Sequence, residues 1–451
     1  MAYISNTAED RAEMLAAMGF TSFQELLDPI PEAIRLKGDL NVPTALDEGG
    51  ILRHLQELAA KNLDMESHLC FLGAGIYDHF RPTVVGMLAV RGEFATAYTP
   101  YQPELSQGML QAIYEYQTLI CAITNMDIAN ASMYDAATGL AEAALMATSL
   151  LNRSDIVVSC AVNPHYRQVI ETYAKVTGYR VLDAPILDGV TDVDALAQMV
   201  NDKTACVIFQ QPNFFGNLED VATLTNTAHR VGALAIDSVD PIALGLLKPP
   251  GDDGVDIVVG EGQPLGTPMG YGGPLLGFFA CNKRFVRSFP GRIVGATLDS
   301  EGRRGYTMTL RTREQDIRRE KATSNICTNQ ALMALCATIY LCELGKSGLR
   351  QVADLSLQKA HYAVLELSKI EGVEPLFPKA KFFKEAAVKL PVDVATLNKT
   401  LLQSKILGGL DLGAYYPEYA GASLLCVTET KTKGDIDRLV EATRSAIEGA
   451  N

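Results

Sequence analysis

Short apolar runs alternate with helical segments between about residue 130 and residue 285. The strand-like runs are IVVS (156–159), RVLDAP, CVIFQQP, LAIDS, DIVVG and LLGFFAC, and stretches such as HYRQVIETYAKVTG and EDVATLTNTAHRVG between them have helical spacing. Short apolar strands that alternate with helices are typical of a mainly parallel sheet that is buried on both faces. The pattern therefore predicts an α/β domain in the middle of the chain.

The two flanks of this region have different patterns. Before about residue 65 the spacing predicts helices alone, the first capped by Asn6 or Thr7 and ending near Met18. After about residue 300 it predicts a long helix that starts near Thr328, a second helix, short strands and a final helix near 434–448. We therefore expect a helical arm (1–65) that packs on a partner, a large α/β domain (66–325), and a small α+β domain with a linking helix (326–451).

Composition narrows the class of protein. Of the 451 residues 48% are apolar and 20% are charged, as in ordinary soluble globular proteins, and no apolar run approaches the roughly 20 residues that span a bilayer. The formal net charge of −14 argues against general nucleic-acid binding, which needs a basic surface. Nine cysteines without paired spacing and six scattered histidines give no metal motif, and unpaired thiols suit a reducing cytoplasm. We expect a cytoplasmic protein without nucleic-acid, membrane or metal partners.

Polar residues gather where the predicted strands end. Asp237 ends LAIDS, Gln210-Gln211-Pro212 ends CVIFQQP, and the loop 261–274 follows DIVVG. In α/β sheets of this kind, ligands bind in the crevice beyond the carboxyl ends of the strands. The sequence therefore predicts a ligand site at this edge of the sheet.

Asp237 and the loop after DIVVG have the pattern of a pyridoxal phosphate (PLP) site without its lysine. A carboxylate against the pyridine nitrogen keeps that nitrogen protonated, so that PLP acts as an electron sink. At the turn where a PLP enzyme places its Schiff-base lysine, the chain reads GEGQPLGTPMGYGGP, with Gln263 in the lysine's place. An amide nitrogen cannot condense with the coenzyme's aldehyde. Either the likeness is accidental, with Asp237 an ordinary loop or cap residue, or the lysine is on another chain.

Asp135 bears on the same site. In MYDAATGLAEAALMA it is placed as the N-cap of an alanine-rich helix. Such a helix start binds the coenzyme phosphate in PLP folds, through its free N–H groups. A carboxylate on those donors would repel phosphate, which favours a vacated site. An ordinary capped core helix predicts the same residues.

Two further segments carry candidate ligand groups. In AYTPYQPELSQG the phenols of Tyr98 and Tyr101 can donate to a carboxylate or stack on a ring, although a rigid turn explains the same pattern. In EKATSNICTNQ several small donors precede a predicted helix, as in a phosphate cradle, and simple capping is the alternative.

Several long motifs resemble one family over nearly the whole chain. They are FLGAGIYDHFRP, FATAYTPYQPELSQG, SMYDAATGLAEAALMA, DSVDPIALGLL, GEGQPLGTPMGYGGPLLGFFA and RREKATSNICTNQAL. They are similar to the N-terminal-type (alpha) subunits of glycine decarboxylase, the P-proteins of the glycine cleavage system. The resemblance implies a PLP-dependent transferase of fold type I, related to aminotransferases, with a large mainly parallel-sheet domain and a small C-terminal α+β domain.

The resemblance also implies how the enzyme is assembled and what it does. Two homologous subunits form an α2β2 heterotetramer with the active site at the α–β interface. The beta-type subunit carries the Schiff-base lysine and holds most of the PLP, and Gln263 matches the loss of that lysine from the alpha type. The complex decarboxylates glycine and transfers the aminomethyl group to the lipoyl arm of H-protein.

Roles for individual residues follow from the resemblance as expectations. Substrate or interface candidates are Tyr98, Tyr101 and Gln102. Candidates that approach the partner's PLP phosphate are Thr323, Ser324, Asn325 and Thr328. The vestigial site of this chain comprises Asp237, Gln263 and Asp135. One segment departs from the family: CAVNPHYRQV has Asn163 and His165 where a histidine and a glutamate are expected, so no site role is assigned to either.

Two other functions stay open at this stage. A self-sufficient PLP decarboxylase or aminotransferase would need another lysine such as Lys248 or Lys283, and neither is placed at the strand-end turn. A PLP-fold chain that serves only as a non-catalytic regulatory scaffold is the second alternative.

Overall fold

The computed structural model describes residues 5–97, 100, 102–322 and 324–449. It divides into two compact units, Met1–Leu63 and Asp64–Asn451. The division of the second unit into a large and a small domain remains a prediction.

The N-terminal unit is helical, as the spacing predicts. Its elements are α1 (Ala8–Ala17), η1 (Phe23–Leu27), η2 (Glu32–Ile34) and α2 (Glu48–Ala59). Thr7 caps α1 through a reciprocal pair of bonds with Asp10. None of the residues in these four elements is buried, and the apolar side chains of α2 at positions 51, 52, 55 and 58 are all exposed. The packing of this unit on a partner remains a prediction.

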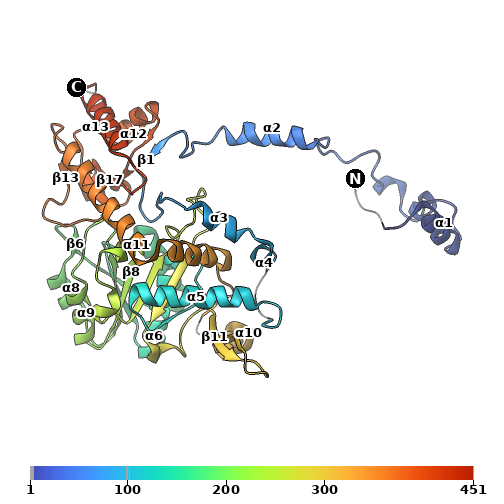
Figure 1. Cartoon of the computed structure of the whole chain (residues 1–451), viewed down its shortest axis with the longest axis horizontal. Helices are drawn as coiled ribbons and strands as arrows, with labels where there is room; N and C mark the ends of the chain where they lie inside the picture. The colour runs from blue at the N-terminus through green and yellow to red at the C-terminus, as the bar shows by residue number, and fades with distance from the viewer. Residues whose placement is uncertain (1–4, 98–99, 101, 323, 450–451) are drawn as a thin grey trace. The chain divides into compact units, whose positions relative to one another are not determined.

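A seven-stranded sheet forms the centre of the second unit (Figure 1). Its strands lie in the order β2-β10-β9-β8-β7-β3-β4. The bounds are β2 (Ile128–Ala129), β3 (Asp155–Ser159), β4 (Arg180–Ala184), β7 (Thr204–Gln211), β8 (Leu234–Val239), β9 (Ile257–Glu261) and β10 (Gly277–Cys281). The five strands from β9 to β4 are parallel, and β10 is antiparallel to both β9 and β2. The predicted α/β architecture with a mainly parallel sheet is therefore confirmed.

Helices cover both faces of this sheet. They are α5 (Gln107–Thr124), α6 (Ala136–Leu151), α7 (Pro164–Thr177), α8 (Val193–Met199), α9 (Val221–Arg230) and the first part of α11 (Ala331–Leu367). Consecutive strand residues contribute to two separate apolar clusters, because side chains alternate between the faces. On β8, for example, Ala235 belongs to the cluster under α5, α9 and α11, and Ile236 to the one under α6 and α7.

The C-terminal region contains a second sheet of four antiparallel strands, β13-β14-β17-β16. Its strands are β13 (Glu374–Pro375), β14 (Glu385–Lys389), β16 (Leu410–Asp411) and β17 (Ala422–Cys426), and its helices are α12 (Val394–Gln403) and α13 (Lys433–Glu448). The predicted start of the linking helix near Thr328 is wrong. Helix α11 begins at Ala331, because the backbone N–H of Thr328 is bonded to the Tyr134 hydroxyl and Gln330 is not helical.

Shorter elements complete the second unit. They are β1 (Leu69–Cys70), paired with β15 (Ile406–Leu407); α3 (Thr83–Ala89); α4 (Gly92–Ala95); the pair β5 (Ile186–Leu187) and β6 (Val190–Thr191); the hairpin β11 (Ile293–Leu298) and β12 (Arg304–Thr309); α10 (Gln315–Arg318); and the 3-10 turns η3 (Ala243–Gly245), η4 (Pro250–Asp253), η5 (Lys283–Phe285), η6 (Arg311–Arg313), η7 (Arg319–Lys321), η8 (Leu412–Ala414) and η9 (Pro417–Tyr419).

Helix α11 is the one helix of the described residues that is long and apolar enough to cross a membrane. Ala334, Leu341 and Ala353 of this helix are buried in the cluster that covers the sheet. It packs as the core helix of a soluble protein does, and bends at Gly345, whose φ of 56° is outside the helical range.

Candidate active site

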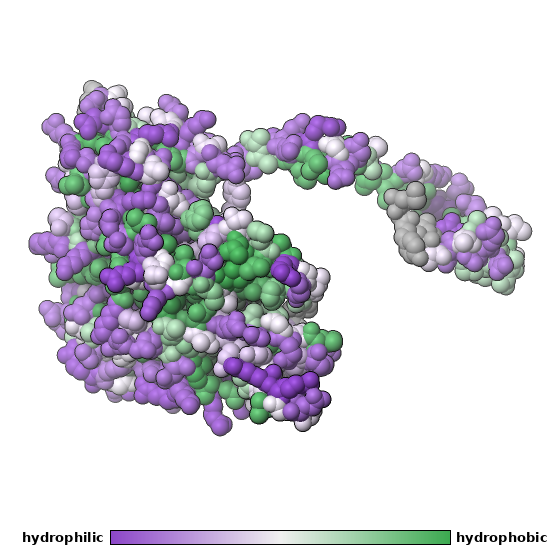
Figure 2. All heavy atoms as spheres, viewed as in Figure 1, coloured by the Kyte–Doolittle hydropathy of each residue, from purple (hydrophilic) through white to green (hydrophobic). Residues whose placement is uncertain are grey.

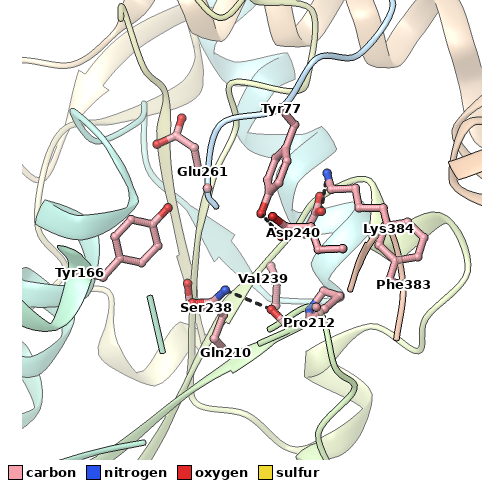
Figure 3. A pocket seen from close by; sticks show the side chains of 13 residues that line it. Tyr77, Tyr166, Gln210, Pro212, Ser238, Val239, Asp240, Glu261, Phe383 and Lys384 are labelled. Carbon is pink, nitrogen blue, oxygen red and sulfur yellow. Dashed lines mark hydrogen bonds and ion pairs between the residues drawn. The ribbon is translucent and has the colours of Figure 1, made fainter. Parts of the chain in front are cut away.

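A small cavity lies at the carboxyl ends of β7, β8 and β9, where the strand-end pattern places a site (Figure 3). Its volume is about 30 Å³, which is room for one or two water molecules. Loop residues 73–80, helix α7 and the start of β14 close it from other directions. The lining residues are Gly75, Tyr77, Tyr166, Gln210, Pro212, Gly216, Ser238, Val239, Asp240, Glu261, Phe383, Lys384 and Glu385.

Gln263 follows β9 and is buried beside this cavity, with 1% of its surface exposed. Its Oε1 accepts the backbone N–H of Tyr77 at 2.9 Å, and its Nε2 donates to the backbone carbonyl of Tyr77 at 3.0 Å. Nε2 also donates to the carbonyl of Thr267 at 2.7 Å. The amide is therefore fully engaged with backbone groups of this chain.

Two carboxylates bind the N-terminus of α6. Asp135 is the N-cap, as the sequence predicts, and its Oδ1 accepts the N–H of Thr138 at 2.7 Å. Glu261 Oε2 accepts the N–H of Ala136 at 3.2 Å, and Glu261 Oε1 accepts the N–H groups of Gln263 and Leu276. Burial raises the pKa of Glu261 to about 7, and the three N–H donors oppose that rise. Two of the N–H groups that would cradle a phosphate, those of Ala136 and Thr138, are therefore already bonded to carboxylates.

Asp237 is buried in β8 without a hydrogen-bond partner among the described residues. Its side chain is fully buried, and neither Oδ1 nor Oδ2 has a donor within reach. Burial raises the pKa of this carboxyl well above its usual range, and the nearby carboxylates of Glu219 and Asp253 raise it further. Buried carboxyl groups normally have partners, so Asp237 is an exception, and its origin in a former coenzyme site remains a prediction.

Lys384 is the one lysine among the residues that line the cavity. Its Nζ lies 2.6 Å from Asp240 Oδ2, 3.0 Å from the Nε2 of His79 and 3.5 Å from the centre of the Tyr77 ring. Figure 3 shows the ammonium group directed at Asp240. Three partners therefore surround the amino group of Lys384 inside the cavity wall.

Lys248 and Lys283, the lysines considered for a self-sufficient enzyme, do not line the cavity. Lys248 is exposed and pairs with Asp253 at 2.5 Å, and Lys283 starts the surface turn η5. Asn163 and His165 have structural contacts: Asn163 caps α7 and donates to the carbonyl of Ala74, and His165 contacts the Tyr415 hydroxyl at 3.1 Å.

In the 324–328 loop, backbone N–H groups are bonded to this chain's own residues, and the hydroxyls of Ser324 and Thr328 accept bonds from this chain. The Tyr134 hydroxyl accepts the N–H of Cys327 at 3.2 Å, Arg292 donates to Thr328 Oγ1 at 3.2 Å, and Ser324 Oγ accepts the N–H of Ile326. Asn325 and Thr328 are exposed. Gln102 is exposed in the loop before α5. Tyr98, Tyr101 and Thr323 lie outside the described residues.

The residues around this cavity do not fit PLP. Pockets for ligands of that size measure roughly 300 Å³ or more, about ten times the volume found here. No lysine of the described residues is free at the strand-end turn, and two carboxylates bind the helix end that would hold phosphate. The described residues also contain no cluster of three or more histidine, cysteine or acidic side chains that could hold a metal ion.

Residues 1–443 match the family model described as Glycine cleavage system P-protein. A relative in Desulfitobacterium hafniense, named probable glycine dehydrogenase (decarboxylating) subunit 1, is 50% identical and covers 98% of both chains. A relative with the same name in Brevibacillus brevis is 51% identical and covers 97% of both chains.

Solved structures give the same grouping. The chain superposes on glycine decarboxylase (P-protein) of the glycine cleavage system, in inhibitor-bound form, with a TM-score of 0.89, 44% identity, and coverage of 99% of this chain and 100% of that chain. A sphingosine-1-phosphate lyase from Burkholderia pseudomallei shares the fold at 17% identity with a TM-score of 0.67, covering 93% of this chain and 95% of that one. The expected fold class, PLP-dependent transferase fold type I, is therefore confirmed.

Proposed function

This chain belongs to the glycine cleavage system P-protein family, and from that membership we propose that it is the subunit of a glycine decarboxylase that does not carry the Schiff-base lysine. The observation that supports this role is the combination of about 50% full-length identity to proteins named subunit 1 with a cavity that does not fit the coenzyme. PLP is the coenzyme of the complete enzyme, and a homologous beta-type subunit holds most of it.

The reaction is decarboxylation of glycine coupled to transfer of its aminomethyl group to lipoyl H-protein. The carboxyl group leaves as carbon dioxide, and the lipoyl disulfide is reduced as it accepts the aminomethyl carbon. PLP supplies the electron sink for this chemistry when it is bound. This chain completes the interface at which the coenzyme and glycine are held.

An apolar groove on the second unit is the surface we propose for the beta-type subunit. It lies between α3, α4, α5 and the start of α11, and its volume is about 540 Å³. Figure 2 shows apolar side chains gathered on this part of the unit. Exposed apolar patches of this kind mark protein–protein interfaces. The relatives are named subunit 1, which implies that a second subunit exists. The apolar lining comprises Val84, Leu88, Phe94, Ala112, Leu335 and Ile339. We propose an α2β2 assembly.

Three loop residues are proposed to shape the glycine pocket across this interface: Tyr98, Tyr101 and Gln102. The two phenols suit a carboxylate substrate because they donate hydrogen bonds. An unchanged KM for glycine in a complex that carries Tyr98→Phe and Tyr101→Phe would remove this role.

The loop 323–328 is proposed to approach the partner's PLP phosphate, with Thr323, Ser324, Asn325 and Thr328 as donors. In the complex, Ser324→Ala combined with Thr328→Val is expected to raise the Kd for PLP roughly tenfold, because hydrogen bonds to a charged phosphate are lost. Titration of the apo-complex with PLP measures this change. Thr172→Val, on an exposed face of α7, is the control that leaves the Kd unchanged. An unchanged Kd in the double variant would contradict the proposal.

Reconstitution with the lysine-bearing homologue tests the proposed function. Carbon dioxide released from carboxyl-labelled glycine is expected only when both subunits, PLP and lipoyl H-protein are present. Full activity of the homologue alone would make this chain a regulatory scaffold. Activity of this chain alone with PLP would make it a self-sufficient enzyme.

A further inference from the structure

Residues 73–80, which we call the strap, pass beside Gln263, and Gly75 and Tyr77 of the strap line this chain's cavity. Tyr77 enters the cavity from the strap and is 8% exposed (Figure 3). Glycines let the strap approach closely: a Cβ on Gly73 would lie 2.3 Å from Glu385 Oε1, and Gly75 has a φ of 113°. The strap therefore occupies volume that a coenzyme would need.

Hydrogen bonds fasten the strap along its length. Ala74 N–H donates to Glu385 Oε1 at 2.6 Å, and the Tyr77 hydroxyl donates to Glu385 Oε2 at 2.8 Å. At the far end, His79 Nδ1 and the Phe80 N–H bond to the carboxylate of Glu429 at 2.6 and 2.7 Å. Both ends of the strap are therefore hydrogen-bonded to the C-terminal region, and its middle is hydrogen-bonded to Gln263.

The bond pattern at Gln263 is one that a lysine could not make. A primary amide offers a donor and an acceptor side by side, so it can pair with both groups of one residue's backbone, as Gln263 does with Tyr77. A lysine ammonium has three donors and no acceptor, and would leave the Tyr77 N–H unpaired. Gln263 therefore makes a pair of bonds to the Tyr77 backbone that a lysine at this position could not make.

We propose that Gln263 is a latch that holds the strap inside this chain's own coenzyme cavity, while Glu261 occupies the helix end that would bind phosphate, so that the chain stays closed to PLP even with a lysine restored at position 263. This inference rests on the proposed function only in taking PLP as the coenzyme of the enzyme.

Hydrogen exchange and coenzyme binding of the isolated full-length chain test the latch. Gln263→Met keeps the length of the side chain and removes its two bonds to Tyr77 and its bond to the Thr267 carbonyl. We therefore expect exchange of the Tyr77 amide to speed up about tenfold, as the loss of about one hydrogen bond implies. Gln117 makes the same reciprocal pair with Val294, at 2.9 Å for each bond. Gln117→Met is therefore the matched control, which speeds exchange at Val294 and leaves Tyr77 unchanged.

Gln263→Lys is expected to show no visible absorbance of bound coenzyme and no borohydride-fixed adduct at millimolar PLP. A stoichiometric adduct on the new lysine would overturn the proposal, and so would unchanged Tyr77 exchange in Gln263→Met. Neither readout uses glycine, so failure of the complex to decarboxylate glycine would refute the proposed function and leave the latch standing.

Discussion

Replacing Lys384 with methionine is expected to lower the free energy of unfolding by about 3–5 kcal/mol. The ammonium and Asp240 are a nearly dry pair: 2% of the lysine side chain and 9% of the aspartate side chain are exposed. Removing one partner leaves the other charge buried without compensation, which costs more than the pair itself contributes. Urea unfolding of the full-length chain measures the loss.

Two further variants separate charge burial from packing in this prediction. Lys379→Met removes an exposed lysine that pairs with Asp188 at 3.4 Å, and is expected to cost less than about 1 kcal/mol. Adding Asp240→Asn to Lys384→Met removes the Asp240 carboxylate that has lost its partner. The double variant is therefore expected to be more stable than Lys384→Met alone. A double variant that is further destabilised would contradict this account of the pair.

Replacing Asp237 with asparagine is expected to stabilise the chain at pH 8 by roughly 1–3 kcal/mol, because a buried carboxylate without partners is removed. This stabilisation depends on pH because the pKa of Asp237 is raised in the folded chain. The folded state binds a proton that the unfolded state releases above about pH 4, so stability falls as pH rises from there toward the folded pKa. The gain in the variant is therefore absent near pH 4 and grows with pH.

Asp256→Asn is the matched control for Asp237. Asp256 is also fully buried, but its carboxylate is bonded to the Ala235 N–H, His229 and Arg284. Its replacement is expected to destabilise the chain at pH 8, since charge-assisted bonds are lost. Urea unfolding at several pH values compares the two variants. An Asp237→Asn chain that is less stable than the parent at pH 8 would show that the carboxylate has a native partner.

The sequence predicts the central sheet well, because each buried strand is a short apolar run between helical segments. Asp135 was placed correctly as an N-cap, since that signal is local. Asp237 was expected at the end of its strand, but it lies inside β8, two residues before the last strand residue Val239. The start of α11 was placed three residues too early, because Tyr134, almost 200 residues away, holds the Thr328 backbone out of the helix.

Most of the cavity could not be predicted from the sequence. Tyr77, Lys384 and Glu385 come from a loop and from the start of β14, about 300 residues apart, and meet only in the folded chain. Glu261 is visible in the GEGQPLG segment, but its bond to the start of α6 depends on the sheet. The sequence shows that the lysine is missing, and only the structure shows that the strap lines the cavity and bonds to Gln263.

If the coenzyme is attached to the partner and never to this chain, borohydride reduction of the active complex followed by peptide mapping will locate it there. We expect one reduced adduct for each pair of subunits, on a lysine of the beta-type subunit, and no modified lysine in this chain. An adduct on Lys384, Lys248, Lys283 or any other lysine of this chain would contradict this expectation.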